Sequence, residues 1–140
     1  MNRVLVVADP AEPGAALADA VRARAARGGC NFTLLVPAVA HGLHRVVDPE
    51  NACCEEAQAA VARLVPQLEA AAGAPVASRI GSHEILAAVE DAVNEGRFTE
   101  AIVCPSTSRM ARWLHVDLAR KIAALGVAVT TISAAARVAA

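Results

Sequence analysis

Aromatic residues are nearly absent from this chain, which has no tyrosine, one tryptophan and two phenylalanines among 140 residues. The basic residues are scattered, with no aromatic rings between them on which bases could stack. The net charge is −1, so the chain also lacks the positive charge that attracts a phosphate backbone. We therefore expect no nucleic-acid partner. Because large aromatic side chains are rare, we also expect alanine-rich helices packed closely against strands of Val, Ile and Leu.

Long hydrophobic runs and export signals are missing as well. The longest early apolar run, Val4–Ala8, is far shorter than a signal peptide core or a membrane span. The chain has four cysteines but no Cys-x-x-Cys pair, so reduced thiols are the default expectation. These absences predict a soluble, cytoplasmic protein with no membrane partner.

Motifs of the common enzyme classes do not occur. The chain has no Gly-x-Ser-x-Gly elbow, no Walker loop and no Gly-x-Gly-x-x-Gly turn. A phosphoacceptor receiver domain would need an aspartate at the end of the third strand, where this chain has Ser78-Arg79. It would also need a lysine after the fifth, where this chain has Thr131-Ile132-Ser133. We expect a protein that is not an enzyme.

Apolar runs of strand length alternate with segments of helical periodicity along the whole chain. The predicted strands are 3–8, 30–37, 75–80, 101–104 and 127–132. The predicted helices are 14–27, 52–72, 82–96 and 110–125. Pro66 interrupts the second of these helices, so we expect a kink or a break there. The connection 38–51 is longer than a usual βα loop.

This alternation predicts one α/β domain spanning residues 1–140. Right-handed crossovers between parallel strands give a five-stranded, doubly wound sheet in three α/β/α layers, and the flavodoxin-like strand order is 3-2-1-4-5. The leading proline of strand 75–80 suits an edge position. In this order strands one and four are neighbours, so Asp9 and the turn Pro105–Arg109 would share one crevice.

The turn after the fourth strand has the groups that an anion site needs. Ser106, Thr107 and Ser108 offer hydroxyls and backbone N–H groups, and Arg109 offers a guanidinium, all where a helix begins. Serine and threonine are also ordinary helix N-caps, so a purely structural role stays open. For Asp9, the alternatives are a ligand contact at the crevice and a simple Asp-Pro strand end.

Cysteine and histidine residues suggest two weaker hypotheses. The vicinal pair Cys53-Cys54 lies at a predicted helix start, where the helix dipole favours a thiolate, so the pair could act as a thiol sensor. His41 and His44 precede this pair, but the spacing does not match a common zinc pattern, so we expect no metal. His83 and His115 are single residues with no acid or nucleophile partner evident in the sequence.

Four segments give the chain a resemblance to the universal stress protein family. They are Val-Leu-Val-Val-Ala-Asp, Leu-Leu-Val-Pro, Glu-Ala-Ile-Val-Cys-Pro-Ser and Gly-Val-Ala-Val-Thr-Thr-Ile, in the family's order of elements. The resemblance covers nearly the whole chain. It implies a flavodoxin-like sheet of the adenine nucleotide alpha hydrolase kind and a homodimer paired through strand five. In one branch of the family, it implies ATP held across strands one, two and four.

The resemblance also assigns roles to particular positions. Asp9 matches the acidic residue at the ribose, and Val36-Pro37 lies where the second strand meets adenine. Pro105, Ser106 and Ser108 fall where the family's phosphate loop begins.

The chain departs from the glycine-rich pattern of the ATP-binding members. That pattern is Gly-x-x-Gly, nine residues, then Gly-Ser or Gly-Thr, and here Pro105 and Ser108 replace the two early glycines. Proline removes a backbone donor, and side chains obstruct close approach to a phosphate. Asp117 adds a like charge that would cost about 4 kcal/mol at roughly 4 Å and an effective dielectric near 20. Ordinary ATP binding is therefore not expected.

Two functional hypotheses remain open at this point. The first is a dimeric, non-enzymatic binding or regulatory domain of the stress response, with a small-molecule or protein partner and an altered nucleotide crevice. The alternative is an adenine-nucleotide-binding protein in which a modified loop still holds ATP or AMP, with slow hydrolysis of ATP left open.

Overall fold

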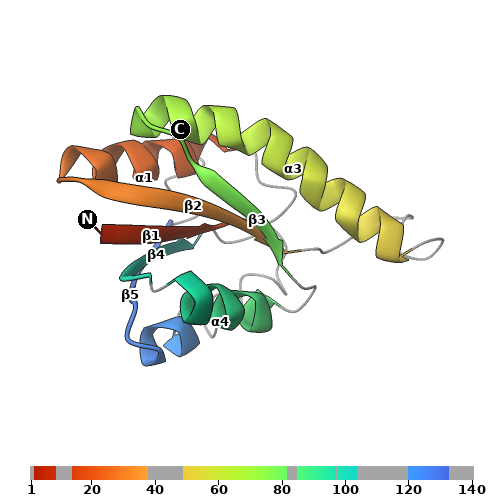
Figure 1. Ribbon diagram of the computed structural model, residues 1–140. Coiled ribbons are helices and arrows are strands. Elements are labelled where there is room, and N and C mark those ends of the chain that lie inside the picture. Colours follow the sequence, from red (N-terminus) through yellow and green to blue (C-terminus); the bar gives the residue numbers. More distant parts are fainter. Residues whose placement is uncertain are drawn as a thin grey trace.

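One parallel sheet organises the computed structural model, which describes residues 2–8, 14–37, 49–81, 85–96, 98–103 and 120–132. Within these residues the sheet has five strands in the order β3-β2-β1-β4-β5 (Figure 1). The predicted order 3-2-1-4-5 is thus confirmed. The strands are β1 (Asn2–Val7), β2 (Cys30–Pro37), β3 (Ala77–Gly81), β4 (Glu100–Val103) and β5 (Ala128–Thr131).

The central strand β1 is buried on both faces. Val6 lies in register with Leu34 of β2 and Ile102 of β4. Side chains alternate between the two faces of a strand, so Val4 and Val6 enter one core cluster, whereas Leu5 and Val7 enter the other. All four side chains from Val4 to Val7 are at most 2% exposed. A continuous apolar run is what such a doubly covered strand requires.

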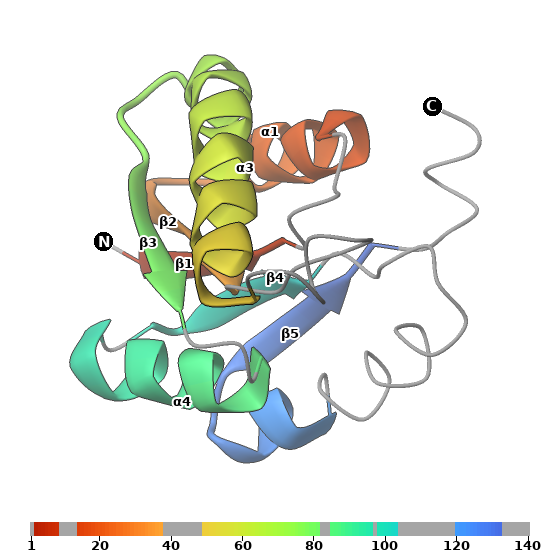
Figure 2. The same ribbon diagram turned by 90° about the vertical axis from the view of Figure 1, so that its right-hand side faces the viewer.

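Helices cover both faces of the sheet and make the three expected layers. The helices α1 (Ala15–Ala26) and α3 (Pro49–Ala72) pack against each other on one face (Figure 1). Helix α4 (Ile85–Gly96) lies on the opposite face, beside the helical residues 120–124 (Figure 2). None of the helices in these described segments is long and apolar enough to cross a membrane.

Helix α3 continues through Pro66 without a break. Pro66 and Ala62 are both exposed, so the carbonyl of Ala62, which loses its helical donor, can bond to water instead. Leu64 and Leu68 flank the proline and are fully buried in the core, and this packing holds both halves of the helix on the sheet. The free energy gained by packing Leu64 and Leu68 in the core therefore outweighs the local cost of a proline inside the helix.

The ends of several elements differ from the prediction by one to three residues. Strand β3 begins at Ala77 rather than 75, and α3 begins at Pro49 rather than 52. Both edge strands are where the sequence placed them, with β3 at one side of the sheet and β5 at the other. Most of the predicted helix 110–125 and of the connection 38–51 lies outside the described residues.

Candidate functional site

The crevice predicted from the sequence begins where β1 and β4 end side by side. Val7 and Val103 are register partners at the carboxyl ends of these two parallel strands. The backbone N–H of Ala8 still donates to the carbonyl oxygen of Leu35, at 3.1 Å, so the chain leaves β1 at this edge of the sheet. In doubly wound sheets the ligand site lies outside this edge, at the point where the strand order reverses.

Most of the residues predicted for this crevice lie outside the described residues, so their roles stay predictions. They are Asp9, Pro105, Ser106, Ser108 and Arg109. The structure does describe Val36, whose side chain is fully buried in the core cluster beneath α1 and α3. A ligand in the crevice would therefore meet the backbone of Val36 rather than its side chain. Pro37 is the last residue of β2 and lies in register with Gly81 of β3.

The cysteine and histidine hypotheses are likewise not settled. His41 and His44 lie outside the described residues, as do His83, His115 and Cys104. The pair Cys53-Cys54 lies in the first turns of α3, as the sequence suggested for a helix start. Among the described side chains, no group of three or more His, Cys, Asp and Glu could hold a metal ion. Cys30 is a free, half-buried thiol.

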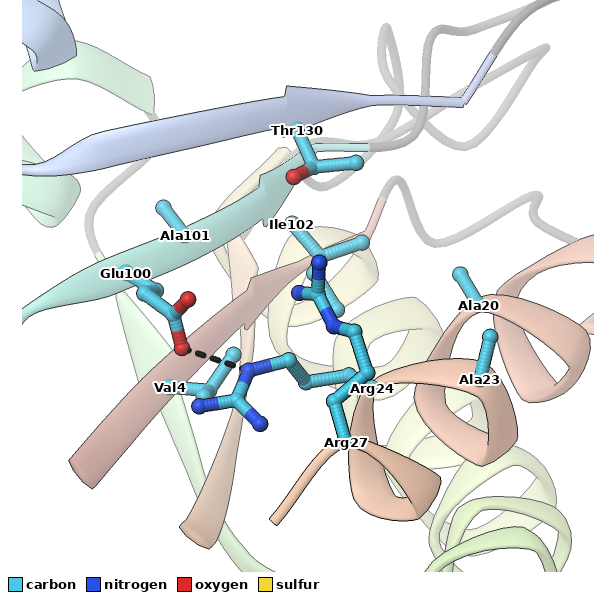
Figure 3. A pocket seen from close by; sticks show the side chains of 9 residues that line it. All are labelled: Val4, Ala20, Ala23, Arg24, Arg27, Glu100, Ala101, Ile102 and Thr130. Carbon is cyan, nitrogen blue, oxygen red and sulfur yellow. Dashed lines mark hydrogen bonds and ion pairs between the residues drawn. The ribbon is translucent and has the colours of Figure 1, made fainter.

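A second region, which sequence reasoning missed, is a pocket of about 230 Å³ beside α1. It lies on the α1 face of the sheet, over Glu100–Ile102 of β4 and beside Thr130 of β5 (Figure 3). Its lining comes from α1, β1, β4 and β5: Val4, Ala20, Ala23, Arg24, Arg27, Glu100, Ala101, Ile102 and Thr130.

An ion pair forms one wall of this pocket. The Nε–H group of Arg24 donates to Oε2 of Glu100 at 2.7 Å, which joins the last turn of α1 to the first residue of β4. The two side chains are only 10% and 28% exposed. A cation at this end of a helix also interacts favourably with the helix dipole. Arg24 is the buried charged side chain of the described core.

A second arginine enters the pocket from the end of the same helix. Arg27 is the C-cap residue of α1, and its side chain reaches into the pocket alongside that of Arg24 (Figure 3). Within the described part of the chain, its guanidinium makes no hydrogen bond and no ion pair. Thr130 projects its hydroxyl from β5 on the other side (Figure 3). With two arginines and one glutamate, the lining carries a net charge of +1.

Small residues on α1 make room for this pocket. Ala20, Ala23, Arg24 and Arg27 follow the spacing i, i+3, i+4, i+7, which places them on one face of the helix. The two alanines leave space above the sheet that larger apolar side chains would fill. The sequence contains one signal that could have indicated a buried arginine here. Arg24 continues the helical spacing of Leu17 and Val21, which are both fully buried. An arginine in that register must face inward and needs an acidic partner.

The strand order, the parallel pairing and the helices on both faces define the class of this protein as a flavodoxin-like, doubly wound α/β domain. No protein-family model matches the sequence, and no curated protein matches it significantly. Solved structures of universal stress proteins do match the structure.

Three of these structures show how far the likeness extends. UspA from Lactobacillus plantarum is 16% identical, with 94% of this chain and 97% of that chain covered at a TM-score of 0.68. A universal stress protein from Archaeoglobus fulgidus is 14% identical, with 95% of this chain and 94% of that chain covered at a TM-score of 0.66. A universal stress protein in complex with cAMP is 14% identical, with 94% of this chain and 97% of that chain covered at a TM-score of 0.64. The resemblance predicted from the sequence is thereby confirmed at the level of the fold.

Proposed function

We propose that this protein is a universal-stress-protein-like domain that acts in the stress response by binding and regulation rather than by catalysis. The observation that carries the proposal is the shared fold, which covers 94% or more of this chain and of each of the three universal stress proteins. The absence of enzyme motifs from the sequence supports a binding role. The free thiol of Cys30 is consistent with the reducing cytoplasm that we propose as its location.

The binding site of this domain is the crevice at the ends of β1 and β4, and we propose that it does not hold ATP tightly. The reason lies in the sequence that follows β4. Pro105 and Ser108 stand where a phosphate loop needs glycines, and Asp117 adds negative charge near the expected phosphates. A ligand with three phosphates carries the most charge into this region and suffers most from that repulsion.

A second candidate function is the binding of an adenine nucleotide with a single phosphate. One structural neighbour was solved in complex with cAMP, and this observation favours the second candidate. A cyclic or simple monophosphate brings fewer charges toward Asp117 than ATP does, and Asp9 could accept hydrogen bonds from its ribose.

Calorimetric titration distinguishes these functions. We expect no tight binding when Mg-ATP is titrated into the purified protein, and micromolar affinity would overturn the first proposal. Mass spectrometry of gently denatured protein is the companion measurement, since co-purified AMP, ADP or ATP would favour a nucleotide-binding role. If AMP or cAMP binds, Asp9→Ala should weaken it, whereas Asp19→Ala, an exposed change on α1, should not.

We propose further that the protein is a homodimer paired through β5. The support is that β5 is an edge strand, with three of its four residues exposed. The N–H groups of Ala128 and Ile132 donate inward to the carbonyl oxygens of Thr99 and Val103, so by alternation the N–H of Thr131 faces the open edge. Thr131→Pro should therefore block pairing without removing a bond of the sheet, while Thr131→Val should leave it intact. Light scattering of both variants tests this, and a monomeric unmodified protein would contradict it.

A further inference from the structure

The pocket beside α1 is separate from the nucleotide crevice. Val4 and Glu100 are register partners near the amino ends of β1 and β4, whereas the crevice lies beyond the carboxyl ends of the same strands. Among the described residues, the lining of the pocket includes neither Val36 nor Pro37, which were predicted for the crevice. The ligand of this pocket is therefore inferred from the residues that line it.

Its charges are not balanced by the residues that line it. Glu100 is bonded to Nε of Arg24, which leaves the terminal amino groups of Arg24 and the whole guanidinium of Arg27 without partners among the described residues. A guanidinium has a fork of donors that matches a carboxylate in shape and charge. One carboxylate would bring the net charge of the lining from +1 to zero.

The rest of the lining is apolar. Val4 and Ile102 form the sheet side of the pocket, and Ala20 lies opposite on α1 (Figure 3). The volume of about 230 Å³ is below the range of about 300–1,000 Å³ found for drug-sized ligands. This combination suits a short aliphatic chain beside a single charged group.

We propose that this pocket binds a small organic acid with a short aliphatic chain. Its carboxylate accepts hydrogen bonds from Arg27 and from the hydroxyl of Thr130, and its chain lies between Ile102 and Ala20. A nucleotide is disfavoured because it is larger and because its phosphates would meet the carboxylate of Glu100. A neutral ligand of the same shape would gain no charge-assisted hydrogen bond from Arg27.

Hexanoate and 1-hexanol are matched probes for this proposal, since they share one chain and differ in charge. We would titrate each into the isotopically labelled full-length protein and follow backbone and arginine side-chain NMR signals. Hexanoate should give saturable shifts confined to residues around the pocket, and 1-hexanol at the same concentrations should bind at least about tenfold more weakly.

Variants test the roles of charge and space separately. Arg27→Gln should weaken hexanoate binding about tenfold or more, and Arg22→Gln, an exposed change on the same helix, should alter it less than about twofold. Ala23→Leu should narrow the pocket at its exposed rim without changing its charge, whereas Ala26→Leu changes another exposed position that is outside the lining. An amide spectrum of each variant verifies that it is folded.

Three results would overturn the proposal. The first is the lack of any saturable hexanoate binding by the folded protein. The second is equal binding of hexanoate and 1-hexanol. The third is binding that Arg27→Gln and Ala23→Leu leave unchanged. Because ATP and cAMP are not used as probes, failure here leaves the proposed function of the crevice untouched, and failure of nucleotide binding there leaves this proposal untouched.

Discussion

The Arg24–Glu100 ion pair should contribute far more to stability than the other ion pair of α1, Arg22–Asp19. Both are short, at 2.7 Å and 2.9 Å, but they differ in exposure. The side chains of Arg24 and Glu100 are 10% and 28% exposed, and those of Arg22 and Asp19 are 63% and 62% exposed. The two pairs therefore form a matched comparison on a single helix.

The magnitude follows from this difference in burial. Two unit charges about 4 Å apart attract by about 4 kcal/mol at an effective dielectric of about 20. Removal from water offsets part of this for Arg24–Glu100, and hydrogen bonds to charged groups contribute about 1.5–3 kcal/mol in practice. We expect a coupling free energy of about 2 kcal/mol for this pair. The exposed pair should give about 0.3–0.5 kcal/mol, as other helix surface pairs do.

A double-mutant cycle measures both values. Glu100→Gln and Arg24→Met, alone and together, preserve side-chain volume while removing charge, and Asp19→Asn with Arg22→Met forms the matched cycle. Urea unfolding followed by circular dichroism gives each free energy of unfolding. Repeating the cycles in 1 M salt should weaken the exposed coupling more than the buried one. The reasoning is refuted if the Arg24–Glu100 coupling is no larger than that of the exposed pair.

Three further predictions concern the packing of the fold. A Cβ at Gly14, where φ is +107°, would lie within 3.0 Å of two side chains of α3, so Gly14→Ala should destabilise the protein by about 2–3 kcal/mol. Gly73→Ala, at φ +69° with open space around it, should cost only about 1 kcal/mol, and equal losses would contradict the steric argument. Leu17→Ala should cost about 2–5 kcal/mol because Leu17 is fully buried, whereas Leu125→Ala, at a position 42% exposed, should cost less than about 1 kcal/mol. Pro66→Ala should raise the free energy of unfolding by about 1–3 kcal/mol by restoring a helical hydrogen bond, and no gain in urea unfolding would contradict the expected cost of proline at this position.

Much of the fold could be predicted because its signals are local. Val4–Val7 forms a continuous apolar run, which indicates a strand buried on both faces whatever its neighbours are. The alternation of such runs with helical segments leaves few topologies, because βαβ crossovers are right-handed. The fate of Pro66 was less predictable, since the core contacts of Leu64 and Leu68 that keep α3 continuous come from distant strands.

The two candidate sites also differ in how far they can be predicted from the sequence. The sequence predicts the place of the crevice, because carboxyl ends of adjacent parallel strands meet at one edge of the sheet, and the structure confirms that β1 and β4 are neighbours. The pocket beside α1 could not be predicted in this way. Arg24 and Glu100 are 76 positions apart in the chain, and no local pattern relates the end of one helix to the start of a strand so far away.

The amino-acid sequence by itself determined the kind of each element and the order of strands, because hydrophobic periodicity and crossover handedness act over short stretches of chain. Only the tertiary structure decided which charged residue enters the core and which partner it meets. Burial of a charge depends on the several elements that surround it, so the pairing of Arg24 with Glu100 appears only after α1 is packed on β1 and β4.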